Sequence, residues 1–189
     1  MALAAYSRFK NKSIPGNCKL FYGLTTSPSA VTLTSGEIST FTSAASTFYE
    51  IKADVDGIKF ENSGKLNKSG SVFEGKLTVK LTVASQVLAN TLIANLYSII
   101  GQGISLIYTD NNKNSFLFGH NANDVLLEKD RDIMSFDYSF DSGEAPGEDG
   151  KQLITLVFTA KTLSTPIPFN STIGGTISGG TASFITYAS

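Results

Sequence analysis

The chain has 189 residues and a formal net charge of −1, with 41% apolar and 16% charged residues. This length suits one domain with a sizeable core, and the near-neutral charge excludes a molecule that attracts nucleic acid as a whole. The single cysteine, Cys18, excludes an internal disulfide. No stretch reaches the roughly 18 apolar residues of a membrane helix, and the first residues lack the apolar run of a signal peptide. We therefore expect a protein that stays in the cytoplasm or leaves it by a route other than ordinary secretion.

The first quarter of the chain predicts strands after a basic arm. Residues 1–16 are small, polar or basic and predict an irregular segment that ends at Pro15 and Gly16. Residues 18–25 form a short apolar run that is typical of a strand. The Ser/Thr-rich tract 26–47 contains alternating apolar residues, which favour edge strands or a long hairpin over disorder.

Alternation becomes clearer in the next segments. Residues 48–54 alternate apolar and charged side chains and predict a half-buried strand. Asp56 and Gly57 suit a tight turn, so residues 58–62 are expected to pair back on that strand as a hairpin. Residues 71–83 have the most regular two-residue period of the chain and predict a long strand.

One segment changes to a helical period. Residues 86–100 predict an amphipathic helix, with Ser85 as a candidate N-terminal cap and Gly101 placed where a helix ends. We expect the helix to pack on a sheet through an apolar stripe. Its residues are Leu88, Leu92, Leu96 and Ile99.

The remaining segments return to strand patterns. They cover residues 104–109, 115–119, 125–128, 133–140, 151–162 and 181–187. Met134, Phe136, Tyr138 and Phe140 fall on one face of their strand. With one helix among about ten strands, the fold is expected to be mainly β, a two-sheet sandwich or barrel with one flanking helix. The organisation is an N-terminal arm and hairpin (1–45), a body (46–162) and a Gly/Pro-rich C-terminal arm (163–189).

The sequence offers little for catalysis. His120 is the single histidine, and Cys18 has no basic neighbour other than Lys19, so neither suggests an activated nucleophile. Cysteine and histidine are too few for a zinc site. The carboxylates in 124–149 leave a calcium site conceivable, although their spacing fits turns better. We therefore expect no enzyme activity and no cofactor.

Charge is unevenly distributed along the chain. Residues 1–20 carry Arg8, Lys10, Lys12 and Lys19 without an acid, whereas residues 124–150 carry nine acids against two bases, a net of −7. Such asymmetry marks either a contact surface or two solvated loops. One hypothesis is that the arm residues Arg8, Lys10 and Lys12 contact the acidic stretch of an adjacent copy.

The order of segments from residue 46 onward resembles a known family. It reads STFYEIKADVDGIKFENSG, then GKLTVKLTV, an amphipathic helix, ISLIYTDNNKNSFLFGH, FDYSFDSGEAPGEDG and QLITLVFTAK. This order is similar to the neck, ring and tail-tube type subunits of tailed bacteriophages, most of all to small ones from crAss-like and other phages of Bacteroidetes. The resemblance covers residues 46–162 and rests on the pattern of segments; it includes neither arm.

The resemblance implies a tail-tube-like fold and a structural virion subunit, assembled in the host cytoplasm. Copies would form a ring of six or twelve around a DNA channel and contact adjacent portal, neck or tail proteins, without a membrane. DNA would pass without specific binding. The acidic residues Asp141, Glu144, Glu148 and Asp149 would then line the channel, or else lie on a solvated hairpin tip. Two alternatives are a secreted adhesin, pilin or carbohydrate-binding sandwich, and an enzyme or ligand-binding barrel.

Overall fold

The computed structural model shows a mainly β chain, with one helix among the residues that it describes. It describes residues 17–24, 30–42, 47–51, 53, 57–67, 70–82, 86–100, 103–119, 134–141, 152–169 and 183–186. In chain order the elements are β1 Asn17–Leu24, β2 Ala30–Thr34, β3 Glu37–Thr42, β4 Thr47–Ile51, β5 Ile58–Asn67, β6 Gly70–Thr82, α1 Gln86–Ile100, β7 Ile104–Asp110, β8 Ser115–Phe118, β9 Met134–Asp141, β10 Leu153–Thr162, β11 Ile167–Pro168 and β12 Ser183–Thr186.

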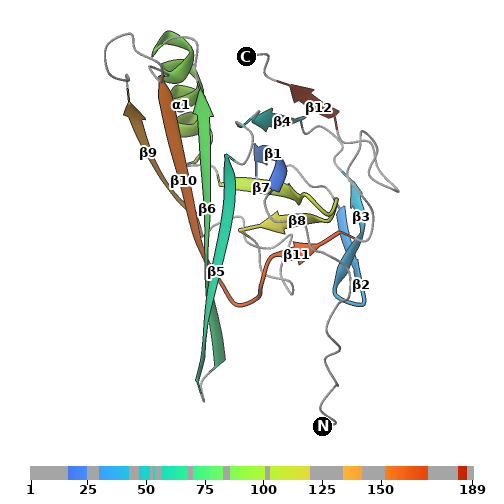
Figure 1. The fold of residues 1–189 in the computed structure, drawn as a ribbon. Helices are drawn as coiled ribbons and strands as arrows, with labels where there is room; N and C mark the ends of the chain where they lie inside the picture. The colour runs from blue at the N-terminus through green and yellow to red at the C-terminus, as the bar shows by residue number, and fades with distance from the viewer. Residues whose placement is uncertain are drawn as a thin grey trace.

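Ten of the strands belong to one sheet that splits at β1. One edge of β1 pairs with β7, while the other pairs with β5 only at Asn17 and Ile58 and with β4 from Leu20 onward. The sheet therefore separates into two layers that face each other (Figure 1). The outer layer has the order β5–β6–β10–β9, and the inner layer has the order β12–β4–β1–β7–β8–β11.

Apolar side chains fill the space between the two layers. Leu77, Leu156 and Phe158 of the outer layer and Leu20 and Leu106 of the inner layer are fully buried in this first core. Burying each such side chain contributes roughly 1.5–3 kcal/mol to folding. The predicted sandwich with one flanking helix is confirmed. The barrel alternative is wrong, because β9 and β11 end the sheet without pairing with each other.

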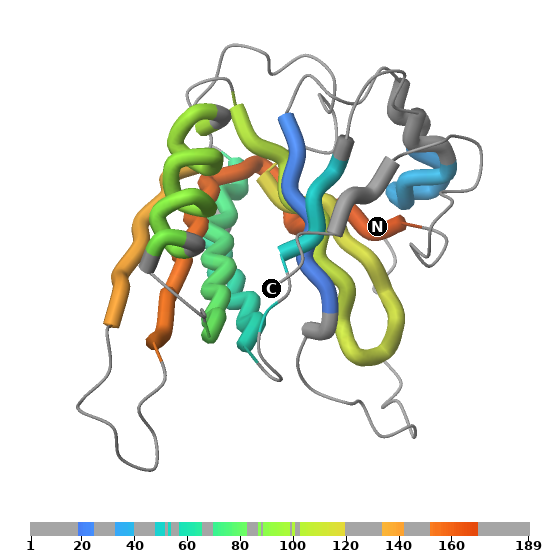
Figure 2. The backbone as a smooth tube through the Cα atoms, turned by 90° about the horizontal axis from the view of Figure 1, so that it is seen from above, coloured from blue at the N-terminus to red at the C-terminus, as the bar shows by residue number. Residues whose placement is uncertain are grey.

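Helix α1 has the predicted bounds and contributes to the first core. Ala89, Ile93 and Leu96 are buried there at helical spacing, and Leu92 and Ile100 are half-buried against it. The helix contacts β9 and lies at one end of the outer layer, as Figure 2 shows from above. It therefore covers the inner face of this layer where β9 ends the sheet.

A second, smaller core lies on the far face of the inner layer. The hairpin β2–β3 forms a separate two-stranded sheet, and its Ile38 packs with Ile107 and Leu117. Phe48 and Phe169 complete the cluster together with neighbouring apolar residues. The tract 26–47 therefore contains the hairpin that its alternation favoured. Its turn residues Ser35 and Gly36 both have positive φ, 55° and 85°, as a type I′ turn requires.

Two turns follow different rules. In the turn between β7 and β8, Asp110 Oδ1 accepts a hydrogen bond of 2.8 Å from the Asn114 backbone N–H. The expected hairpin around Gly57 is wrong. Strand β4 pairs with β1 and β12, and β5 pairs with β6 over ten residue pairs. The expected strand at 125–128 lies outside the described residues.

Candidate assembly surfaces

Strand β5 begins in the core and extends out of it toward its C-terminal end. Ile58 is buried, whereas every residue from Glu61 to Lys65 is exposed, on both faces of the strand. This far part of β5 pairs with β6 and projects with it beyond the other strands (Figure 1). Apart from the pair of Ile58 with Asn17, no other described strand pairs with the second edge of β5. Unpaired backbone groups on such an edge can bind a further strand.

Strand β9 is the opposite edge of the outer layer. It pairs with β10 from Met134 to Asp141, and no second partner strand exists among the described residues. Met134, Phe136 and Phe140 pack against the first core, as the expected common face predicts. The alternate positions, including Asp137, are exposed. The edge therefore has one apolar and one polar side.

The outward side of the outer layer is a continuous polar face. The strand registers place together on it Lys59, Glu61, Ser63 and Lys65 of β5; Val72, Glu74, Lys76, Thr78, Lys80 and Thr82 of β6; Leu153, Thr155, Val157, Thr159 and Lys161 of β10; and Ser135, Asp137, Ser139 and Asp141 of β9. The face contains five lysines and four carboxylates, so its formal net charge is +1. The face contains no arginine, the residue best suited to clamp phosphate.

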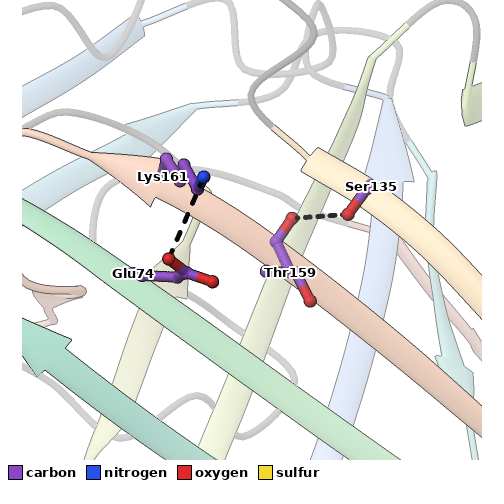
Figure 3. Close-up of polar contacts among 4 residues, drawn as sticks. All are labelled: Glu74, Ser135, Thr159 and Lys161. Carbon is purple, nitrogen blue, oxygen red and sulfur yellow. Dashed lines mark hydrogen bonds and ion pairs between the residues drawn. The ribbon is translucent and has the colours of Figure 1, made fainter.

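The contacts described here across the polar face are exposed. Figure 3 shows Lys161 Nζ at 4.0 Å from Glu74 Oε2, and Ser135 Oγ donating to the Thr159 carbonyl oxygen over 3.5 Å. Lys59 Nζ lies 2.8 Å from Glu61 Oε1, and this hydrogen bond lowers the pKa of Glu61. Exposed ion pairs of this kind contribute little to stability, so they do not explain why the face is so rich in charge.

Aromatic side chains gather where α1 meets β9. Tyr97 contacts Phe136 and Tyr138 edge-on, with ring centroids 5.8 and 6.1 Å apart. Tyr97 is 54% exposed and Tyr138 is 44% exposed. Large aromatic side chains that remain this exposed beside an open strand edge are typical of contact surfaces.

The residues singled out from the sequence have different positions. Leu92 and Leu96 pack as expected, whereas the side chains of Leu88 and Ile99 lie outside the described part. Ile93, an apolar residue beside this stripe, is also buried. The sequence pattern did not indicate Ala89, which is fully buried.

Among the acidic candidates, Asp141 is described, exposed and on the polar face at the end of β9. Glu144, Glu148 and Asp149 lie outside the described residues, as do the arm residues Arg8, Lys10 and Lys12 and also His120. Any contact between the two charged groups would therefore involve residues outside the described ranges. Reading the strand edges would have required the strand order, which the sequence does not display.

The described ranges contain no group of three or more His, Cys, Asp or Glu side chains placed to hold a metal ion. Within the same ranges, no helix has the length and apolar character that crossing a membrane requires. In comparisons with known proteins, no family model, no curated protein and no solved structure matches the chain.

Proposed function

We propose that the protein is a non-catalytic structural subunit that assembles into a closed ring around the DNA channel in the neck or tail of a tailed bacteriophage. One observation carries this proposal. The outer layer is a four-stranded antiparallel sheet whose two outermost strands, β5 and β9, have open edges among the described residues. Such edges are normally blocked or used for association.

The direction of the strands supports a head-to-tail contact. In an antiparallel layer with an even number of strands, the first and last strands run in opposite directions. Strand β9 of one copy can therefore lie antiparallel to β5 of the next, which continues the same alternation. A contact between two different surfaces, repeated by rotation, closes into a ring.

The polar face would line this ring, because α1 and the inner layer cover the other face of the outer layer. Six copies would supply 24 strands, which at about 4.8 Å spacing gives a circumference of about 115 Å and a diameter of about 37 Å between backbones. Strand tilt would widen it, and twelve copies would double it. The adjacent portal, neck or tail proteins would contact the two rims.

The charges of this face suit a channel through which DNA slides. Its lysines and carboxylates nearly cancel, so it offers neither a strong phosphate site nor a strong barrier. Asp141 lies on this face, and the acidic residues Glu144, Glu148 and Asp149 that follow it would add negative charge and repel phosphate. We expect the channel lining to bind DNA weakly and without sequence preference.

The decisive experiment measures the particle formed by the full chain. Light scattering and electron-microscopy class averages over a range of concentrations should show a closed ring, with six or twelve copies expected. A chain that remains monomeric at every concentration would contradict the proposal. If that monomer bound a glycan, the adhesin or carbohydrate-binding alternative would replace it.

A further inference from the structure

We infer that the copies join in one register, with Ser135–Asp141 of β9 antiparallel to Glu61–Asn67 of β5 in the neighbouring copy. This inference rests on the proposed ring and specifies how its contact is made. It sets Asp137 opposite Lys65 on the polar face and Tyr138 opposite Gly64 on the apolar face. Three observations on the described residues select this register.

The first observation is that the beginning of the β5 edge is occupied. Ile58 pairs with Asn17 of β1 on that edge. An incoming strand must therefore pair further along, where Glu61–Lys65 are exposed. A register centred on Lys59 would place Tyr138 opposite Ile58 and would collide with β1.

The second observation concerns the faces of the strands. On β9 the odd-numbered residues face the polar side, and on β5 the odd-numbered residues from Lys59 to Lys65 do the same. Because side chains alternate along a strand, a shift of one residue would turn the apolar side of β9 toward the polar face. Only registers shifted from this one by an even number of residues keep the polar sides of both strands on the same face.

The third observation is charge complementarity. Asp137 and Lys65 are both exposed, and neither forms an ion pair with another described residue. Opposite charges directly across two strands stabilise their pairing, and like charges destabilise it. The inferred register pairs these two charges. It also sets Asp141 opposite Glu61, whose carboxylate is already held by Lys59 at 2.8 Å and faces Lys76 across the strands.

Glycine at position 64 fits the apolar side of this contact. A Cβ on Gly64 would lie 2.9 Å from the ring of Phe73, which occupies the space beside the backbone. Tyr138 of the neighbouring copy would approach on the other side of Gly64 and extend the aromatic row from Phe73 to Tyr97. This would bury the exposed parts of Tyr97 and Tyr138, which the isolated chain leaves in water.

Cysteine cross-linking reads the register directly. Paired residues across antiparallel strands have Cα atoms about 4.5–5.5 Å apart, which suits a disulfide. In a Cys18→Ser background, the variant Asp137→Cys with Lys65→Cys should oxidise to a ladder of covalent multimers. The matched control, Asp137→Cys with Ser63→Cys, tests the register shifted by two residues and should cross-link at least tenfold less.

The outcomes separate the inference from the proposed ring. Rings in which the control pair cross-links better than the inferred pair would overturn the register and leave the ring standing. If the unmodified protein formed no particle, both the register and the proposed ring would be overturned. Ser63, Lys65 and Asp137 are exposed, so circular dichroism of each variant should match the Cys18→Ser parent.

Charge reversal gives an independent test. Asp137→Lys and Lys65→Asp should each weaken assembly several-fold, because like charges then face each other at every contact. The double variant should recover assembly to within about twofold of the original chain. Failure of the double variant to recover, with both single variants impaired, would contradict the pairing of Asp137 with Lys65.

Discussion

The two layers of the sheet differ in what covers them. In β7, at the centre of the inner layer, every residue from Ile104 to Thr109 is buried, because the first core lies on one face and the second core on the other. In β6, at the centre of the outer layer, buried residues alternate with exposed or half-buried ones from Gly75 to Thr82. The inner layer is thus enclosed on both sides. The outer layer offers water a polar face and, among the described strands, two open edges.

This difference indicates how stability and assembly are divided. Apolar contacts that hold the fold concentrate around the inner layer, while charge and open backbone groups concentrate on the outer one. A subunit built in this way can change its contact surface without losing its core. The comparison predicts a large gap between the effects of substitutions in the two layers.

The largest effect is expected in the enclosed layer. Ile107 is fully buried in the second core, so Ile107→Ala should lower the free energy of unfolding by about 2–5 kcal/mol. Val157 on the polar face is half-buried, and Val157→Ala should cost about 1 kcal/mol or less. Denaturant unfolding of both variants measures the difference. If both variants lost the same free energy of unfolding, the two layers would not differ in their contribution to stability.

A smaller effect is expected from Tyr108, which the first core buries. Burial and the carboxylate of Asp110 raise the pKa of its phenol above the ordinary value near 10. A raised pKa in the folded state means that the stability is fully present below pH 10 and is lost as the pH rises above it. At pH 11 the loss should be about 1.4 kcal/mol.

Urea unfolding at pH 9 and pH 11 isolates this contribution. The variant Tyr108→Phe should lose less stability than the original chain between the two pH values. Tyr138→Phe, which removes an exposed hydroxyl from the outer layer, serves as the matched control and should keep the full loss. If Tyr108→Phe showed the same pH dependence as the control, the buried phenol would not be its source.

The smallest effect is expected on the polar face. Lys161 and Glu74 are 4.0 Å apart, with side chains 70% and 53% exposed. Lys161→Met should therefore change the free energy of unfolding by about 0.5 kcal/mol or less, and added salt should reduce even that. A double-mutant cycle with Glu74→Gln measures the coupling between them. A coupling above about 1 kcal/mol would show that the outer layer also stabilises the fold through its charges.

Local patterns predicted the elements better than their partners. The helical period over residues 86–100 and the two-residue period of β6 are strong signals, and both elements lie where expected. The pairing of β4 was predicted wrongly. The turn signal at Gly57 is local, whereas the position of β4 beside β1 buries Phe48 fully and Tyr49 in part.

The candidate surface could be predicted only in part. The common face of Met134, Phe136 and Phe140 follows from alternation, and the structure shows it packed on the core. The open edges depend on the order of the strands in the sheet, and this order is set by segments far apart in the sequence. In the sheet, β10 lies between β6 and β9, although α1, β7 and β8 separate β6 from β9 along the chain. Charge distribution alone directed attention to residues 1–20 and 124–150, not to β5.

The single backbone pair between Asn17 and Ile58 has a mechanical consequence. Hydrogen-bonded ladders hold adjacent strands at a spacing of 4.7–4.9 Å, but only this pair joins the described strands of the two layers. Elsewhere the layers are held by apolar side chains, whose attraction is not directional. The angle between the two layers is therefore set by the volume of the side chains in the first core. Small changes of volume in the first core would tilt the outer layer and alter the curvature that neighbouring copies present to each other.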